Sequence, residues 1–257
     1  MPPDSDQPDR PPTRDEILEI VLGAYRQGVF PMADPQRHPG ELLWFDPDPR
    51  GIIPLAPSAP SAPGDPGGTF RVPSSLRQRV RSRRFLVTSD AAFAQVVRHC
   101  TRSDPPPDQT KDHRPERDDG GVWIDDTLAS LYLALHDAGH AHSVEVWRAH
   151  DRRPGELALV GGLFGVTLNG LFAGESMFSR PEIGGTDASK VALVHLVAHL
   201  RRRGFTLLDT QFTTPHLERF GAIEIPREAY RRRLARALDV DPVWLPWDDD
   251  PSAAFDP

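Results

Sequence analysis

The sequence has a single cysteine, Cys100, among its 257 residues, which excludes an intramolecular disulfide framework. It has no run of eighteen apolar residues, so we expect no membrane-spanning helix and no membrane partner. Residues 1–14 are rich in proline and aspartate and have neither the basic start nor the apolar stretch of a signal peptide. We therefore expect a cytoplasmic protein, and its 38% of hydrophobic residues suffice for a real core.

Lysine is also scarce, since only Lys111 and Lys190 occur, and arginine supplies most of the positive charge. The net charge of −7 argues against a nucleic-acid partner. However, residues 1–16 carry −3 and residues 239–257 carry −6, which leaves about +2 for the body between them. Arginines cluster in this body within residues 77–84, 201–203 and 231–233. The planar fork of arginine suits phosphate, but a solvated helix face accounts for each cluster as well.

Hydrophobic periodicity predicts an α+β chain. Helices are expected over residues 15–27, 91–100, 126–139, 189–203, 216–220 and 227–238. Strands are expected over residues 84–88, around Val144 and Val146, over 157–168, from Leu171 onward and over 205–208. Asn169-Gly170 between two apolar runs predicts a hairpin. Residues 30–50 are rich in proline and aromatic side chains, which favours a packed irregular loop.

The later elements follow the order strand, strand, hairpin strand, helix, strand, helix. This order is typical of the GNAT-type acetyltransferase fold, a mixed sheet with a helix packed on its middle strands. One helix with short connections joins the strand that carries Glu175 to the strand that ends at Asp209, so these two strands should be neighbours. Order alone is a weak argument for function.

Polar side chains stand at the ends of these two apolar strands. Glu175 follows Phe172-Ala173-Gly174, and Asp209 is followed two residues later by Gln211. A charge in such a place is costly unless it is paired or lies at a cleft. Two carboxylates and an amide could orient an amine, take its proton and hold a carbonyl. The same carboxylates could instead cap helices or accept from loop amides, and the pattern alone does not decide.

Three histidines, His136, His140 and His142, form a second candidate. His136 and His140 have the spacing of a helical metal site. However, Gly139 should end the helix before His140, and no glutamate stands beside His136 as in a metalloprotease motif. We expect no metal here and a structural or supporting role for these side chains.

The loop at residues 180–185 lies where a GNAT-type enzyme binds the pyrophosphate of acetyl-CoA. That loop normally reads Gln/Arg-x-x-Gly-x-Gly/Ala, and here the first glycine comes one residue late. The loop is still rich enough in glycine to expose backbone donors to an anion. Lys190 opens the helix that follows, where it could bind a terminal phosphate or simply be solvated.

Several motifs together resemble the leucyl/phenylalanyl-tRNA–protein transferase family. They are residues 28–32 (GVFPM), 44–50 (WFDPDPR), 122–124 (VWI), 135–145 (LHDAGHAHSVE), 174–180 (GESMFSR), 188–190 (ASK), 208–211 (LDTQ) and 221–227 (GAIEIPR). The match runs in order from about residue 22 to residue 234. The resemblance implies transfer of Leu, Phe or Met from aminoacyl-tRNA to the N-terminal amine of proteins that begin with Arg or Lys. This addition marks the protein for degradation by the N-degron pathway.

The resemblance also implies roles for residues. Glu175, Asp209 and Gln211 would form the catalytic centre, without a cofactor or metal. Trp44 and Trp123 would hold the 3′-terminal adenosine of the tRNA, although both could also be core tryptophans. Phe45 follows Trp44 where the family often has a second tryptophan, which leaves open which aromatic stacks on the adenine. The remaining substrate-binding candidates are Ser176, Met177, Phe178 and Lys190, and the arginine clusters would guide the acceptor stem.

The family resemblance divides the chain into a small N-terminal domain at residues 14–70 and a GNAT-like catalytic domain at residues 71–238. Outside it lie a disordered tail at residues 1–13, a disordered insertion at 104–119 and an acidic C-terminal tail at 239–257. The runner-up function is that of a GNAT-type N-acetyltransferase that uses acetyl-CoA. A tRNA- or peptide-binding module without catalysis is the third alternative.

Overall fold

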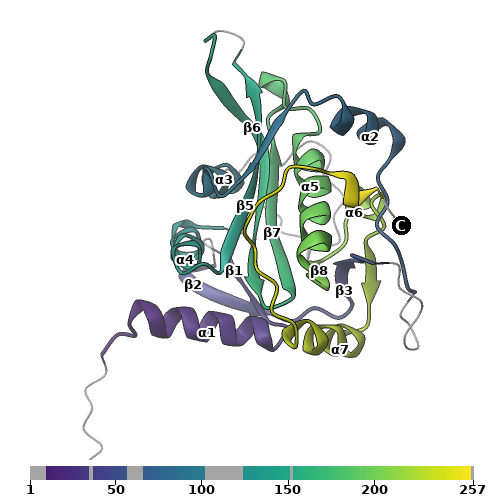
Figure 1. Cartoon of the computed structure of the whole chain (residues 1–257). Helices are drawn as coiled ribbons and strands as arrows, with labels where there is room; N and C mark the ends of the chain where they lie inside the picture. Colours follow the sequence, from purple (N-terminus) through teal and green to yellow (C-terminus); the bar gives the residue numbers. More distant parts are fainter. Residues whose placement is uncertain (1–9, 35–36, 57–65, 102–123, 151–152, 256–257) are drawn as a thin grey trace, which may run out of the picture.

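The computed structural model describes residues 10–34, 37–56, 66–101, 124–150 and 153–255 (Figure 1). The helices are α1 (Arg14–Arg26), α2 (Ser74–Arg81), α3 (Phe93–Cys100), α4 (Asp126–Asp137), α5 (Ala188–Arg203), α6 (Pro215–Glu218) and α7 (Arg227–Leu238). The strands are β1 (Phe30–Asp34), β2 (His38–Phe45), β3 (Arg50–Ile53), β4 (Leu86–Ser89), β5 (Ala141–Ala149), β6 (Leu157–Leu168), β7 (Leu171–Ser179), β8 (Leu207–Gln211) and β9 (Ile223–Ile225). Two single-turn helices are η1 (Pro181–Ile183) and η2 (Ser252–Ala254).

The main sheet has seven strands in the order β4-β5-β6-β7-β8-β3-β9. Strands β7 and β8 are parallel, with Ala173 opposite Asp209, whereas the other neighbours are antiparallel. The predicted hairpin joins β6 and β7, and Asn169 takes the left-handed conformation that its turn requires (φ 52°). The α+β class and the adjacency of the strands that carry Glu175 and Asp209 are thus confirmed.

Helices cover both faces of this sheet, as Figure 1 shows. Helix α5 lies on one face, and α1, α3 and α4 lie on the other. Each face of the sheet has its own apolar cluster, one formed with α5 and one formed with α1, α3 and α4. Close contact between α5 and β6 depends on glycine, since a Cβ at Gly161 would lie 2.4 Å from the Cβ of Ala188. The core therefore has two halves, which fix the sheet from opposite sides.

Helix α1 forms where its apolar stripe predicted it. Thr13 and Glu16 make a capping box at its start, and Tyr25 lies on its buried stripe. Gly28, with φ 83°, follows its end. The helix brings the Tyr25 hydroxyl into the interior of the protein.

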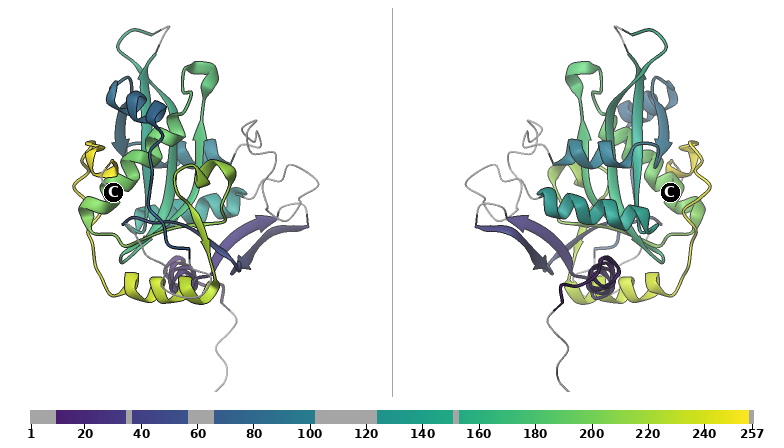
Figure 2. Two further views of the ribbon diagram at one scale, coloured as in Figure 1. Left: turned by 90° about the vertical axis from the view of Figure 1, so that its right-hand side faces the viewer. Right: turned by 90° about the vertical axis from the view of Figure 1, so that its left-hand side faces the viewer.

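The prediction of an irregular loop over residues 30–50 was wrong. Strands β1 and β2 pair there as an antiparallel hairpin, seen projecting from the main body in Figure 2. Strand β3 then enters the large sheet between β8 and β9. The proline content argued against a strand here. Pro31 is nevertheless tolerated, because it lies in a two-stranded sheet made of edge strands, where a missing backbone N–H costs little. A domain boundary at residue 70 stays a prediction, and β3 belongs to the large sheet.

The acidic C-terminal segment runs back over α5, and residues 240–255 are called the C-terminal strap below (Figure 1). Trp244 of this strap is 6% exposed within the α5 core cluster. Arg201, Arg202 and Arg203 donate to backbone carbonyls of the strap. From the sequence we expected residues 201–203 to guide a tRNA stem. In the structure these arginines bind the protein's own C-terminal strap, which accounts for their clustering without tRNA.

The remaining arginine clusters also have partners within the chain. The guanidinium groups of Arg77 and Arg81 lie over the ring of Phe255, and Arg79 pairs with Asp187 at 3.3 Å. Arg231 pairs with Asp46 at 2.9 Å. These contacts account for part of each cluster without any nucleic acid.

Within the described ranges no helix is both long and apolar enough to cross a membrane. The predicted insertion at residues 104–119 lies outside the described residues, and so does Trp123. Most of the predicted tail at residues 1–13 lies outside them as well.

Candidate active site

A pocket of about 140 Å³ opens between the β1–β2 hairpin, β6, β7, β8 and α5, and is called the Glu175 pocket below. Glu175 and Gln211 supply polar groups to it. The other lining residues are Phe30, Met32, Leu163, Phe164, Gly174, Ser176, Met177, Leu193, Leu196, Leu208, Thr210, Phe212, Thr214, His216 and Leu217. The pocket is thus an apolar cavity with a few polar groups, as expected for a site that receives a small ligand group.

Glu175 is 8% exposed and is held by two tyrosines. The hydroxyl of Tyr25 donates to Oε1, and the hydroxyl of Tyr132 donates to Oε2, both at 2.8 Å. Burial raises the pKa of Glu175 from 4.5 to about 7, the two tyrosine hydrogen bonds lower it, and the nearby Asp209 charge raises it. The carboxyl group can therefore gain and lose a proton near neutral pH.

Asp209 lies behind the pocket wall, is 0% exposed and does not line the cavity. Arg50 binds it with two parallel hydrogen bonds of 2.9 and 2.6 Å, and Tyr230 donates to Oδ2 at 2.9 Å. Burial disfavours the charged guanidinium, but the Asp209 carboxylate outweighs this and raises the pKa of Arg50. The pair is a fixed internal ion pair, and Arg50 also donates to the carbonyl of Gly28 at 2.8 Å.

Gln211 is placed by the backbone. Its N–H donates to Oδ1 of Asp209 at 2.9 Å, and its φ of 57° is uncommon for a residue other than glycine. The pairing of β3 with β8 shifts between Gly51 and Ile52, so strict alternation along β8 is lost here. Consequently Gln211 lines the pocket while Asp209 does not, and the Gln211 Nε2 atom has no hydrogen-bond partner among the described residues.

Together these groups can hold an acyl carbonyl and an amine in one place. A carboxyl group with a pKa near 7 can take a proton from an incoming ammonium group. The unpaired amide of Gln211 can hydrogen-bond a polar atom of the ligand. The Asp209–Arg50 pair does not reach the cavity but fixes the strand that presents Gln211.

The raised pKa of Glu175 predicts a pH-dependent effect of the substitution Glu175→Gln. Because the folded-state pKa of about 7 lies above the ordinary 4.5, the stability that this group contributes is fully present below pH 4.5 and is lost as the pH rises through 7. Glutamine has no charge to bury. We therefore expect the variant to gain stability relative to the parent by roughly 3 kcal/mol between pH 4 and pH 8.

Urea unfolding at several pH values measures this difference. Glu228→Gln, which makes the same change at an exposed position outside the pocket, serves as the control. A constant difference for Glu175→Gln would contradict the assignment of a raised pKa.

Comparison with known proteins gives one consistent result. A model of the leucyl/phenylalanyl-tRNA protein transferase family matches residues 66–235, and one of the N-terminal domain of that transferase matches residues 18–48. The chain belongs to the leucyl/phenylalanyl-tRNA protein transferase family. Relatives with this name include one from Salinibacter ruber, 44% identical over 93% of this chain and 87% of its own length. Another, from Paramagnetospirillum magneticum, is 48% identical over 88% of this chain and 91% of its own length.

In this member of the transferase family, only some of the predicted substrate-binding residues line the Glu175 pocket. Ser176 and Met177 line the Glu175 pocket. Phe178 does not, because its ring stacks on His99 with 4.7 Å between ring centres. Lys190 pairs with Asp187 at 2.8 Å and also lies outside the lining.

The two aromatic residues of the WFDPDPR motif lie on β2. Trp44 is 42% exposed, so it is not a core tryptophan. Strand pairing sets Phe45 opposite Phe30 and Leu43 opposite Met32, which places Trp44 on the other face of the hairpin from the pocket-lining Phe30 and Met32. Phe45 is half-buried and its ring packs against Phe30 with 6.1 Å between centres.

The loop at residues 180–185 does not offer the anion site that its glycine content suggested. The N–H groups of Ile183, Gly184 and Gly185 donate to carbonyls of the loop itself. Arg148 also donates to the carbonyl of Ile183 at 3.2 Å. The acetyl-CoA alternative thus loses the backbone donors on which it depended.

Four residues of the site were not singled out by the sequence pattern: Tyr25, Tyr132, Arg50 and Tyr230. Tyr132 lies on the buried face of the helix predicted over residues 126–139, where an aromatic residue is indistinguishable from ordinary core. Arg50 closes the WFDPDPR motif, which was a usable signal. The sequence pattern did not identify the three tyrosines as site residues, because their hydrogen bonds to Glu175 and Asp209 join distant parts of the chain and produce no periodicity.

Proposed function

We propose that this chain transfers Leu, Phe or Met from aminoacyl-tRNA to the N-terminal amine of proteins that begin with Arg or Lys, which marks them for degradation. The observation that carries the proposal is the apolar pocket with a carboxyl group of near-neutral pKa in its wall, in a chain of this family. An apolar side chain of the donor fits the leucine- and methionine-lined part of the pocket. No cofactor is required, because the aminoacyl ester is already activated.

In the proposed reaction the free α-amine attacks the ester carbonyl. The new C–N bond forms, the C–O bond to the terminal ribose breaks, and the ribose hydroxyl leaves with a proton. Glu175 orients the incoming amine, takes its proton as the C–N bond forms and passes this proton to the departing ribose oxygen, and the Gln211 amide positions the reacting groups. Asp209 acts through Gln211 and is a positioning residue, because it does not line the cavity.

The exposed ring of Trp44 is the proposed platform for the terminal adenosine of the tRNA, although it lies on the hairpin face away from the pocket lining, and Phe45 on the pocket side is the alternative. Replacing Trp44 with alanine should raise KM for aminoacyl-tRNA by about 5- to 150-fold and change kcat little, because base stacking contributes about 1–3 kcal/mol. Steady-state transfer assays with varied tRNA measure both constants. Leu157→Ala, which removes another exposed apolar side chain from β6, is the matched control. An unchanged KM for the Trp44 variant would remove this residue from the tRNA site.

One assay separates the candidate functions. The protein is mixed with charged Leu-, Phe- or Met-tRNA and a peptide that starts with Arg or Lys, and mass spectrometry detects an added N-terminal residue. Peptides that start with Ala or Glu test the acceptor preference. Transfer supports the proposal. Acetylation of the same peptide in the presence of acetyl-CoA, or binding of tRNA without transfer by any of the three donors, would refute it.

A further inference from the structure

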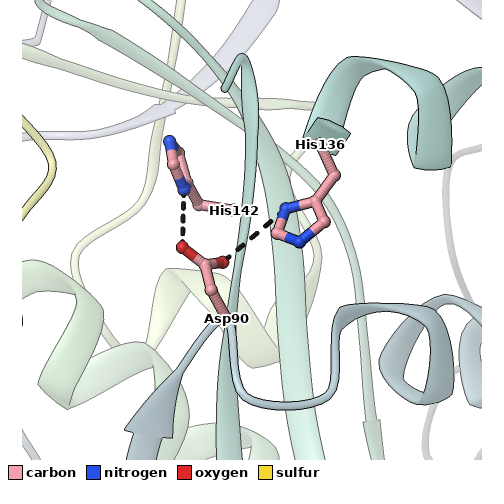
Figure 3. Close-up of side chains that lie close together, drawn as sticks. All are labelled: Asp90, His136 and His142. Carbon is pink, nitrogen blue, oxygen red and sulfur yellow. Dashed lines mark hydrogen bonds and ion pairs between the residues drawn. The ribbon is translucent and has the colours of Figure 1, made fainter. Parts of the chain in front are cut away.

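Two of the three histidines at the junction of α4 and β5 meet an aspartate from a distant part of the chain. Asp90, His136 and His142 each offer a ligand atom, and these atoms all lie within 4.8 Å of one another (Figure 3). His140, the third histidine, is not part of the group. None of the three residues lines the Glu175 pocket, so the cluster is separate from the proposed reaction.

The cluster lies where β4 ends beside β5. Ser89 is the last paired residue of β4, opposite Val144. Beyond it the chain turns at Asp90, whose φ is 56°, so that its carboxylate lies against the open edge of β5. Asp90 Oδ1 accepts the N–H of Ser143 at 2.8 Å, and this contact fixes the carboxylate.

Both imidazole rings are held in place by aromatic neighbours. The ring of His136 lies parallel to that of Phe93, with 4.1 Å between centres and an angle of 2°. The ring of His142 lies on that of Trp244, with 4.4 Å between centres and an angle of 10°. Rings fixed in this way lose little further freedom when they bind an ion.

The hydrogen bonds leave suitable lone pairs for a cation. His136 Nδ1 lies 4.0 Å from Asp90 Oδ1 and 2.8 Å from the carbonyl of Ala141. Donation of the Nδ1 proton to this carbonyl leaves Nε2 as the nitrogen with a free lone pair. A backbone carbonyl behind the second ring nitrogen is the usual support of a metal-binding histidine. His142 Nδ1 lies 2.7 Å from Asp90 Oδ2, where a cation can replace the shared proton. All three side chains are 12–27% exposed, so an ion can enter from solvent.

We propose that Asp90, His136 and His142 form a divalent transition-metal site of the Zn²⁺ type. Two imidazoles and one carboxylate are ligands that zinc accepts, and three protein ligands leave a position for water. Ligand atoms about 2.1 Å from a tetrahedral ion lie about 3.4 Å apart, so the 2.7 Å contact opens by roughly 0.7 Å on binding. The ion ties together the end of β4, the end of α4 and the start of β5.

The chain offers conservative variants for a test. Asp90→Asn keeps an acceptor for Ser143 N–H and tolerates the left-handed backbone, but removes the anionic ligand. His136→Asn removes the second ligand. His140→Asn is the matched control, because this histidine lies four residues along from His136 and outside the cluster.

Untagged full-length protein is treated with a chelator, dialysed and titrated with Zn²⁺ by calorimetry, and Co²⁺ absorption reports the ligand geometry. The parent and His140→Asn should bind one ion per chain, and Asp90→Asn and His136→Asn should bind at least about 10-fold more weakly. Circular dichroism of the metal-free proteins shows that each variant is folded. Three results would overturn the site, whatever the outcome of the transfer assay. The parent could fail to bind the ion, both cluster variants could bind it as tightly as the parent, or His140→Asn could lose as much affinity as the cluster variants.

Discussion

Replacing Glu175 with glutamine is expected to lower kcat/KM for aminoacyl transfer by at least about 100-fold. The change removes the one carboxylate among the described residues that line the pocket, and it keeps the size of the side chain. General-base catalysis contributes about 10²- to 10⁴-fold, and glutamine cannot accept the proton. Initial rates with Leu-tRNA and an Arg-peptide measure the loss, and Glu228→Gln should retain the parent rate.

The fold of this variant should persist, because the amide of the introduced glutamine can still bond the tyrosine hydroxyls that Glu175 binds. The pH profile gives an independent readout. Activity of the parent should rise as Glu175 ionises near pH 7. Tyr132→Phe removes a hydrogen bond that lowers the Glu175 pKa, so the rise should move to higher pH. A full transfer rate for Glu175→Gln, or an unmoved profile for Tyr132→Phe, would refute the role of Glu175 as base.

Replacing Arg50 with methionine is expected to lower the free energy of unfolding by about 3–5 kcal/mol. Arg50 is 1% exposed and Asp209 is 0% exposed, so the change leaves a buried carboxylate without its partner. Chemical denaturation measures the loss. Arg26→Met, on the exposed side of α1, removes a pair of 3.8 Å that is open to solvent and should change stability little.

A second variant separates the lost pair from lost packing. Arg50→Met combined with Asp209→Leu removes both charges and should recover a large part of the stability, because no unpaired charge remains. It should not recover transfer activity, because the Asp209 contact to the Gln211 backbone is gone. If the double variant were no more stable than Arg50→Met, the contribution of Arg50 would be packing and not its charge.

Local patterns were sufficient for most regular elements. The apolar stripe of α1, the Asp125 cap of α4 and the Asn169-Gly170 hairpin each depend on residues close together in the chain. The adjacency of β7 and β8 also followed, because a single helix with short connections joins them. Short elements were harder to predict from the sequence. Helix α2 has few apolar positions to reveal its period, and β3 pairs with strands more than 150 residues away in the chain.

The sequence by itself determined the α+β class, the adjacency of the strands that carry Glu175 and Asp209, and the resemblance to the transferase family. The expectation that both residues stand at strand ends was wrong, because β7 continues to Ser179 and β8 to Gln211. Only the tertiary structure decided that Glu175 faces a pocket between two tyrosines while Asp209 is buried behind it with Arg50. It also decided that Arg201, Arg202 and Arg203 bind the C-terminal strap. The physical reason is that periodicity records which face of an element is apolar, whereas hydrogen bonds between distant segments depend on how the elements pack, and no local pattern encodes them.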